Sequence, residues 1–324
     1  MLLLSRNDVE SLLTMKDAIN AVEEAFKQFA LGNVKMPPKT SIEQNSGVVW
    51  TMPAYIGGPV SALGQKVVTV YPDNPTKHNL PTTLATVELL NPLTGECMAI
   101  MDGTFLTAMR TGAVSGVATK YLARTDSRSA AVFGAGVQAA AQLEAVTEVR
   151  RITSAKVFDN VAGRAKDYCD RMSRKLKISM EEGTDPEETL HGSDIILCAS
   201  TSRVPVFNGD WLEAGTHINA VGSYRPDIRE LDTTTIRRSK VIVDSQDMAL
   251  RETGDLVIPL TEKSISLEHI SGELGEVILG KKGRASQQEI TLFKSVGLAI
   301  QDVSTAQIVY KKALEQEKGT SVRV

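Results

Sequence analysis

Residues 130–139, with the sequence AAVFGAGVQA, constrain the fold of this chain more than any other segment. The apolar run predicts a buried strand, and a helical pattern begins after a turn of three residues. Gly134 permits the tight turn, Gly136 lets the backbone approach a bound group, and Ala139 allows close packing of helix on strand. N–H groups at the start of such a helix bind a diphosphate. The pattern is typical of a dinucleotide-binding Rossmann domain, with contacts predicted from Gly134, Ala135, Gly136, Val137 and Gln138.

A glycine turn alone is a weak indicator, because similar turns occur without any ligand. The next predicted strand, Lys156–Phe158, ends in Asp159, where a carboxylate binds a ribose 2′-hydroxyl and repels a 2′-phosphate. Asp159 could instead only cap the helix that follows. The order of strand, turn, helix, strand and acid favours a bound dinucleotide, with NAD(H) as the preferred cofactor. NADP(H) is the alternative, since the nearby Arg164 could accommodate a phosphate.

Strands and helices alternate along the chain from about residue 104 onward. Near-continuous apolar strands between helices are typical of a parallel sheet with both faces covered. The sequence therefore predicts an α/β domain with a Rossmann-type, doubly wound parallel sheet. Its strands are predicted at Ser129–Phe133, Lys156–Phe158, Lys177–Met180, Asp194–Cys198, His217–Val221 and Val241–Val243, with helices over residues 105–122 and 162–176.

The first hundred residues follow a different pattern. Residues 14–31 predict a helix, and short apolar runs between Pro/Gly turns in residues 36–102 predict a mainly antiparallel sheet. The helical pattern from Gly297 to Val324 is expected to return to this part of the fold. We therefore predict a second, α+β domain from residues 1–118 plus 298–324, and a dinucleotide-binding Rossmann domain from residues 119–297.

Composition and charge exclude several classes of protein. The net charge is −3 and no Lys/Arg run is present, so neither nucleic acid nor an anionic membrane is an expected partner. The apolar start, Met1–Leu4, is too short for a signal peptide or a membrane span. Three distant cysteines and four scattered histidines indicate reduced thiols and no metal site. These features predict a cytoplasmic globular protein.

Two further strand ends should line the same crevice, because ligands lie beyond the carboxyl ends of parallel strands. Their small residues would let a nicotinamide lie against the backbone, although such residues are also ordinary in loops. The predicted cofactor contacts here are Ala199, Ser200, Thr201, Val221 and Gly222.

Candidate substrate-binding groups lie in the first part of the chain. Lys66 falls within the apolar strand pattern Ala62–Val70, where burial would lower its pKa and suit it to proton transfer. An outward-facing, solvated lysine fits the same pattern. Arg110 is the only cation in the small-residue segment 105–119. It could bind a carboxylate through two hydrogen bonds, or it could lie on a solvated helix face.

The order and spacing of several motifs resemble the ornithine cyclodeaminase/μ-crystallin family over essentially the whole chain. These motifs are Met36-Pro37-Pro38-Lys39, Leu63-Gly64-Gln65-Lys66, Met101-Asp102-Gly103, Arg110-Thr111-Gly112-Ala113, the glycine turn, His217–Gly222, Glu273–Glu276 and Phe293–Gly297. The resemblance implies a homodimer whose first domain binds the substrate and pairs with the second copy. It also implies that Lys39 and Arg110 hold a substrate carboxylate and that Lys66 lies at the reacting carbon and nitrogen. Thr83, Ser295 and Gly297 would then contact the cofactor.

One position departs from the cyclodeaminase pattern. Cyclodeaminases have an aspartate two residues after the glycine of the Ala-Val-Gly motif, and this chain has Tyr224 there. That aspartate acts on the substrate amine, so its replacement argues against ornithine cyclisation. The following sequence, RPDIRELD, instead resembles the ketimine reductase branch, and we place Tyr224 among the substrate-binding residues.

We therefore expect an NAD(P)H-dependent reductase of small cyclic 2-imino acids, with Lys66 and Arg110 as the catalytic residues. Its substrate would be Δ1-pyrroline-2-carboxylate or Δ1-piperideine-2-carboxylate, reduced to L-proline or L-pipecolate. An alanine dehydrogenase that uses pyruvate and ammonia is the first alternative, and ornithine cyclodeaminase is the second. A non-catalytic protein of μ-crystallin type, which binds a dinucleotide and a small ligand, is the alternative from a different class.

Overall fold

The computed structural model describes residues 1–323, which form two compact units. Unit 1 contains Met1–Arg110 and the segment that begins at Leu298, and unit 2 is Thr111–Gly297. The chain passes from unit 1 to unit 2 inside helix α4 (Gly103–Leu122) and returns after Gly297. The boundary expected at residues 118/119 falls in the same helix.

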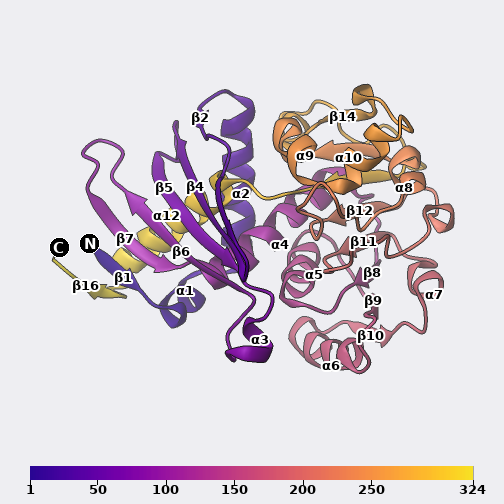
Figure 1. The fold of residues 1–324 in the computed structure, drawn as a ribbon, viewed down its shortest axis with the longest axis horizontal. Coiled ribbons are helices and arrows are strands. Elements are labelled where there is room, and N and C mark those ends of the chain that lie inside the picture. Colours follow the sequence, from indigo (N-terminus) through magenta and orange to yellow (C-terminus); the bar gives the residue numbers. More distant parts are fainter. Residues whose placement is uncertain (324) are drawn as a thin grey trace. The chain divides into compact units, whose positions relative to one another are not determined.

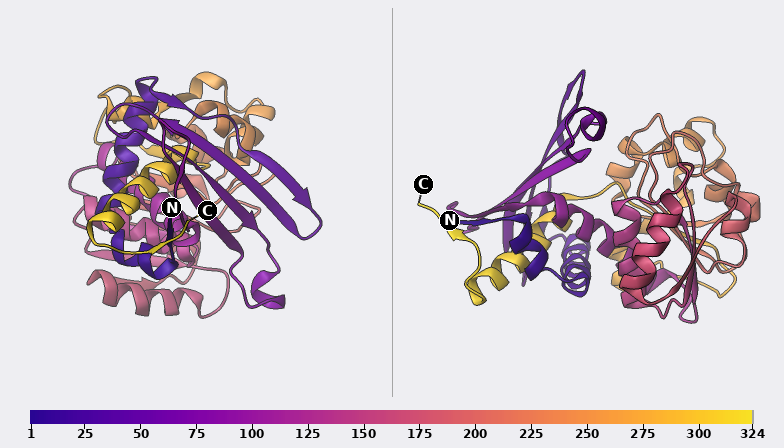
Figure 2. Two further views of the ribbon diagram at one scale, coloured as in Figure 1. Left: turned by 90° about the vertical axis from the view of Figure 1, so that its left-hand side faces the viewer. Right: turned by 90° about the horizontal axis from the view of Figure 1, so that it is seen from below.

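Unit 1 is a mainly antiparallel sheet with helices on one of its faces (Figures 1 and 2). The strand order is β16-β1-β7-β6-β5-β4-β2, with β3 paired to β4; the β1–β7 pair is parallel and the other described pairs are antiparallel. The elements are β1 (Leu2–Leu4), α1 (Arg6–Leu12), α2 (Met15–Ala30), β2 (Val34–Lys35), β3 (Thr40–Gln44), β4 (Gly47–Ile56), β5 (Ala62–Val70), α3 (Asn74–Lys77), β6 (Thr83–Leu90), β7 (Cys97–Asp102), α12 (Ala299–Glu315) and β16 (Thr320–Ser321).

Helices α2 and α12 pack together against β4 and its neighbours, and they bury one face of this sheet. Thr14 caps α2, with Asp17 completing a reciprocal capping box, so that helix begins where its sequence predicts. In the sheet, Lys66 pairs with Met52 on one side and Val87 on the other, and all three side chains are buried. Lys66 therefore faces the helices rather than solvent, and the solvated alternative for this lysine is wrong.

Unit 2 is an eight-stranded sheet in the order β10-β9-β8-β11-β12-β15-β13-β14, with every neighbouring pair parallel. Its strands are β8 (Ser129–Phe133), β9 (Ser154–Phe158), β10 (Ser179–Glu182), β11 (Ile195–Cys198), β12 (His217–Ala220), β13 (Lys240–Val243), β14 (Ile270–Glu273) and β15 (Thr291–Lys294). Its helices are α5 (Val137–Val149), α6 (Arg164–Leu176), α7 (Pro186–Leu190), α8 (Thr233–Arg238), α9 (Gln246–Glu252), α10 (Gly254–Thr261) and α11 (Leu274–Ile278), with short 3₁₀ turns at Gly209–Trp211 and Leu267–His269.

Both faces of the parallel sheet carry apolar side chains. Along β8, Ala130 and Val132 belong to a core cluster with α5 and α6, whereas Ala131 and Phe133 belong to a cluster with α8, α9 and α10. Alternate residues of one strand thus reach opposite faces, as a doubly wound sheet requires. The predicted Rossmann-type fold is confirmed.

Several details differ from the expectations. Strands β14 and β15 were not predicted, although β15 lies between β12 and β13 in the sheet. Strand β10 begins two residues later than predicted, and α12 ends at Glu315 although its helical pattern was expected to continue to Val324. No helix among residues 1–323 has both the length and the hydropathy to span a membrane.

Candidate active site

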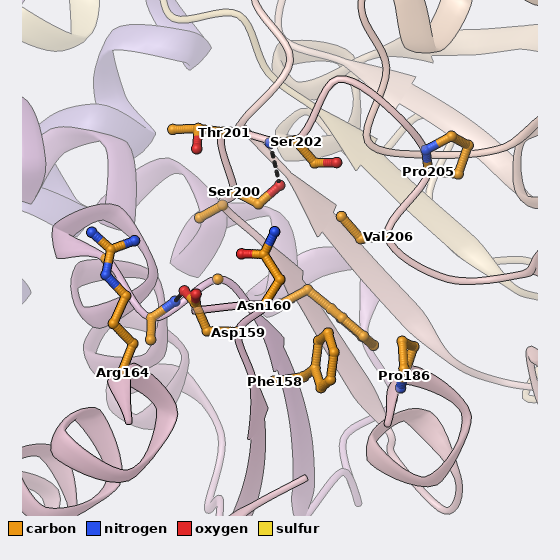
Figure 3. Close-up of a pocket in the computed structure, with 15 residues that line it drawn as sticks. Phe158, Asp159, Asn160, Arg164, Pro186, Ser200, Thr201, Ser202, Pro205 and Val206 are labelled. Atoms are coloured by element: carbon orange, nitrogen blue, oxygen red, sulfur yellow. Dashed lines mark hydrogen bonds between the residues drawn. The ribbon is translucent and has the colours of Figure 1, made fainter. Parts of the chain in front are cut away.

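Unit 2 contains a cavity of about 460 Å³ at the carboxyl ends of β8, β9 and β11. The chain winds from β8 outward through β9 to β10 on one side, and from β11 outward on the other. The cavity thus lies at the point where the strand order reverses, which is where doubly wound sheets bind ligands. Figure 3 shows Asp159, Asn160 and Arg164 on one wall, and Ser200 and Thr201 on another.

The glycine turn forms the floor of this cavity. Gly134 has φ +95°, and a Cβ there would lie 2.8 Å from the carbonyl oxygen of Ala199, so only glycine fits without strain. Gly136 caps α5, and a Cβ added to it would meet no atom within 4 Å. The first N–H groups of α5 are therefore open to a ligand, which matches the needs of a diphosphate.

Asp159 lies in the same cavity and links the turn to the second strand. One carboxylate oxygen accepts a hydrogen bond from the N–H of Ala135 at 2.8 Å, and the other accepts from the N–H of Val161 at 2.9 Å. Each oxygen keeps a lone pair for a ribose hydroxyl. Phe158, Pro186 and Val206 add an apolar surface of the kind a base requires. The residues present thus fit a dinucleotide.

Seven of the predicted cofactor-binding residues line the cavity: Gly134, Ala135, Gly136, Asp159, Ala199, Ser200 and Thr201. Others lie outside it, with Val137 and Gln138 in the first turn of α5, Val221 and Gly222 after β12, and Ser295 and Gly297 after β15. Tyr224, 37% exposed, also follows β12. Thr83 begins β6 in unit 1. The roles of these residues stay predictions.

Unit 1 contains a second group of polar residues, which is almost completely buried. The ammonium group of Lys66 lies 2.9 Å from the carboxylate of Asp302, and Nε of Arg110 lies 2.9 Å from the same carboxylate. Lys66 and Asp302 have 1% and 0% of their side-chain surface exposed, and Arg110 has 8%. We call these three residues the charged cluster. Its members come from β5, α4 and α12.

Two neighbours complete this arrangement. Arg110 Nη1 donates a hydrogen bond to Oε1 of Gln301, and the Nε2 of that amide is buried with no hydrogen-bond partner among the described residues. Lys39, half-buried before β3, lies over the ring of Trp50, with 4.5 Å from Nζ to the ring centroid. Lys39 is close enough to help lower the pKa of Lys66. Lys66 and Arg110, predicted from their sequence patterns, and Lys39, implied by the family resemblance, thus lie in one region of unit 1.

The charged cluster holds two cations and one carboxylate, so its buried net charge is positive. Burial, followed by the nearby Arg110, lowers the pKa of Lys66 to about 8, with the Asp302 carboxylate acting in the opposite direction. A lysine with this pKa holds and releases a proton near neutral pH. The unbalanced positive charge favours an anionic ligand.

Sequence reasoning missed Asp302 and Gln301. Both lie in residues 299–306, the part of α12 in which every side chain is buried. A carboxylate in a helix segment that is buried on all sides must be paired with a cation or hydrogen-bonded. The presence of Asp302 within the apolar helical pattern of residues 298–306 was the feature of the sequence that could have revealed it.

Comparison with known proteins identifies the family to which the chain belongs. The sequence matches the ornithine cyclodeaminase/mu-crystallin family over residues 1–317. The chain belongs to this family.

Three similar members of the family are informative. An alanine dehydrogenase of Archaeoglobus fulgidus is 40% identical over 326 residues, covering 99% of this chain and 98% of its own. The structure of a Δ1-pyrroline-2-carboxylate reductase of Thermococcus litoralis in complex with NADH and L-proline is 50% identical, with a TM-score of 0.96, covering 99% of this chain and 100% of its own. An archaeal alanine dehydrogenase dimer with bound NAD is 40% identical, with a TM-score of 0.94, covering 100% of this chain and 99% of its own.

The described residues include no group of three or more His, Cys, Asp or Glu side chains arranged to hold a metal ion.

Proposed function

We propose that this protein is an NADH-dependent reductase of small cyclic 2-imino acids, with Δ1-pyrroline-2-carboxylate as the substrate and L-proline as the product. The observation that carries the proposal is the charged cluster, which combines a buried excess of positive charge with a lysine of lowered pKa. Reduction of an imino acid requires both features, because a cation binds the substrate carboxylate and a proton donor supplies the proton for its nitrogen. The T. litoralis reductase, 50% identical and bound to NADH and L-proline, supports this choice.

Different residues have different roles in the proposed reaction. The glycine turn and Asp159 would hold NADH, whose chemistry when bound would be to supply a hydride for the carbon of the C=N bond. Arg110 binds the carboxylate of the substrate and fixes its orientation. The protonated Lys66, directly or through a water molecule, supplies the proton that the ring nitrogen needs as that carbon is reduced. Asp302 holds Lys66 and Arg110 in place through the contacts at 2.9 Å.

Alanine dehydrogenase activity is the second candidate, because the alanine dehydrogenases above are 40% identical over nearly the whole chain. A binding protein without activity is the candidate from a different class. Steady-state oxidation of NADH with Δ1-pyrroline-2-carboxylate, together with chiral analysis of the product, tests the proposal. Formation of L-proline supports it, and tight NADH binding without turnover on any imino acid would favour the binding protein.

Asp159 predicts the choice between the two dinucleotides. Its carboxylate repels a 2′-phosphate, so kcat/KM is expected to be higher with NADH than with NADPH. Asp159→Ser should narrow the difference, because the repulsion is lost while Arg164 stays in the cavity. A wild-type preference of tenfold or more for NADPH, about 1.4 kcal/mol, would contradict this assignment.

The lowered pKa of Lys66 predicts how kcat/KM depends on pH. The pKa of its ammonium group is about 8, so the group is charged below that pH and loses its proton above it. With Lys66 as the proton donor, kcat/KM for reduction should be level below about pH 8 and fall roughly tenfold per unit above it. Oxidation of L-proline should show the opposite slope, because that direction needs neutral Lys66. A pH–rate profile in both directions measures this, and two flat profiles would remove Lys66 as the proton donor.

The exposed face of the sheet in unit 1 supports a homodimer. Strand side chains that point away from the helices include several partly exposed apolar residues, namely Val49, Leu63, Val67, Leu84, Leu90 and Ile100. An apolar sheet face of this kind is commonly buried by a second copy. The related archaeal alanine dehydrogenase is a dimer. Light scattering at micromolar concentration should give about twice the 35.0 kDa chain mass, and a monomer would contradict the proposal.

The three cysteines, which form no disulfide bond, support a cytoplasmic location. Cys97, Cys169 and Cys198 are all free thiols, and two of them are buried. Thiols persist in a reducing compartment.

A further inference from the structure

Glu230 is a fully buried carboxylate that joins two loops at the edge of the cofactor cavity. One of its oxygens accepts a hydrogen bond from the N–H of Ser200 at 2.6 Å, and the other accepts from the N–H of Gly222 at 2.7 Å. Ser200 follows β11 and lines the cavity, and Gly222 follows β12. A Cβ at Gly222 would lie 2.3 Å from the carboxyl carbon of Glu230, which explains the glycine at that position.

The surroundings of Glu230 leave its negative charge unbalanced. Asp255 accepts hydrogen bonds from the N–H groups of Glu230 and Leu231, and its other oxygen lies 2.8 Å from Nζ of Lys294. These three ionisable groups are buried, so one cation stands beside two carboxylates. Burial raises the pKa of Glu230, whereas Lys294 and the N–H of Ser200 act in the opposite direction. Each of its oxygens accepts a hydrogen bond from an N–H donor, an arrangement that favours the ionised carboxylate. A net negative charge thus lies directly behind the cavity wall.

This negative charge lies on the side of the cavity where the nicotinamide of a bound cofactor is expected. A dinucleotide with its diphosphate at Gly134 and Gly136 and one ribose at Asp159 would extend across the switch point toward the ends of β11 and β12. Its nicotinamide end would then lie toward the loops that Glu230 holds. The nicotinamide ring of NAD⁺ carries a positive charge, and that of NADH carries none.

We propose that Glu230 is a positioning residue that also stabilises bound NAD⁺ relative to bound NADH, and so makes bound NADH a stronger hydride donor. The proposal rests on the function proposed above. Binding of the oxidised cofactor in preference to the reduced one lowers the reduction potential of the bound pair. A tenfold change in the ratio of the two dissociation constants corresponds to about 30 mV for a two-electron couple.

The test compares the Kd of NAD⁺ with the Kd of NADH, measured by titration calorimetry without substrate. Glu230→Gln keeps the size of the side chain and removes its charge. We expect the ratio of Kd for NAD⁺ to Kd for NADH to rise about tenfold, mainly through weaker binding of NAD⁺. Equal weakening of both cofactors, or no change in either, would overturn the electrostatic role. Absence of binding of both cofactors to the wild-type protein would instead contradict the proposed function.

Three further variants separate charge from structure. Glu230→Asp keeps the charge, so its ratio should stay near the wild-type value even if both affinities fall. Asp194→Asn is the matched control, because this carboxylate also accepts two backbone N–H bonds but lies at the amino end of β11, and its ratio should not change. Should Glu230→Gln fail to fold, Lys294→Met removes the opposing cation and should shift the ratio in the opposite direction. An unchanged ratio there would overturn the proposal.

Discussion

Replacement of Lys66 by methionine is expected to lower kcat for the imino acid by roughly 10²-fold or more. Methionine keeps the apolar stem of the side chain and removes the group that holds the proton. The fold should survive, because Asp302 keeps its contact with Arg110 and the remaining pair is neutral. Binding of NADH should also be retained, since the cofactor cavity is formed entirely by residues of unit 2.

Arg110→Ala provides the contrasting variant. It removes the carboxylate-binding group and leaves a neutral Lys66–Asp302 pair, so it should mainly raise KM, with a smaller loss of kcat from looser orientation. Steady-state kinetics with both variants, after a check of folding and of NADH binding, measures the difference. Full activity of Lys66→Met under these conditions would remove Lys66 from the mechanism. Loss of NADH binding in both variants would mean that unit 1 contributes to the cofactor site.

Replacement of Asp302 by asparagine is expected to have the largest effect on stability. This change leaves two buried cations with no carboxylate between them, and breaking a buried ion pair from one side typically costs about 3–5 kcal/mol. The loss is a large fraction of the roughly 5–15 kcal/mol by which a folded domain is stable. Urea unfolding should show a much lower midpoint, or no folded protein. In the double variant Lys66→Met/Asp302→Asn one cation is gone, so part of the stability should return.

An exposed pair provides the control for this prediction. Asp73 lies 2.6 Å from Lys77 on the surface, with most of both side chains exposed. Asp73→Asn should not change the unfolding midpoint measurably, because solvent screens exposed pairs. Equal stability of the Asp302→Asn and wild-type proteins would show that the charged cluster is not an ionised triad.

The sequence was sufficient to predict the parts of the fold that local pattern determines. The strand, glycine turn and helix at residues 129–149 follow from residues adjacent in the chain, as does Asp159 at the end of the next strand. Helix α2 was predicted from its cap at Thr14 and its apolar stripe. Family resemblance added Lys39, which no local pattern identifies.

The remaining features depend on contacts between distant residues. Strand β15 has four residues and ends in the buried Lys294, whose charge is paired with Asp255 far from it in sequence. Asp302 is 236 residues from Lys66 along the chain, and only the packing of α12 on β5 brings them together. Glu230 likewise looks like a surface acid until Ser200 and Gly222 are seen to donate to it. The periodicity of hydrophobic residues reports only local structure, so it cannot identify buried charges whose partners lie elsewhere in the chain.

The measurement that tests the central claim most directly is a comparison of kcat/KM for three substrates under identical conditions with NADH or NAD⁺ as required. Δ1-Pyrroline-2-carboxylate, pyruvate with ammonia, and ornithine separate the reductase, the dehydrogenase and the cyclodeaminase. The proposed function predicts the highest kcat/KM with Δ1-pyrroline-2-carboxylate and L-proline as the product. A higher kcat/KM with pyruvate and ammonia, or turnover of ornithine alone, would contradict it.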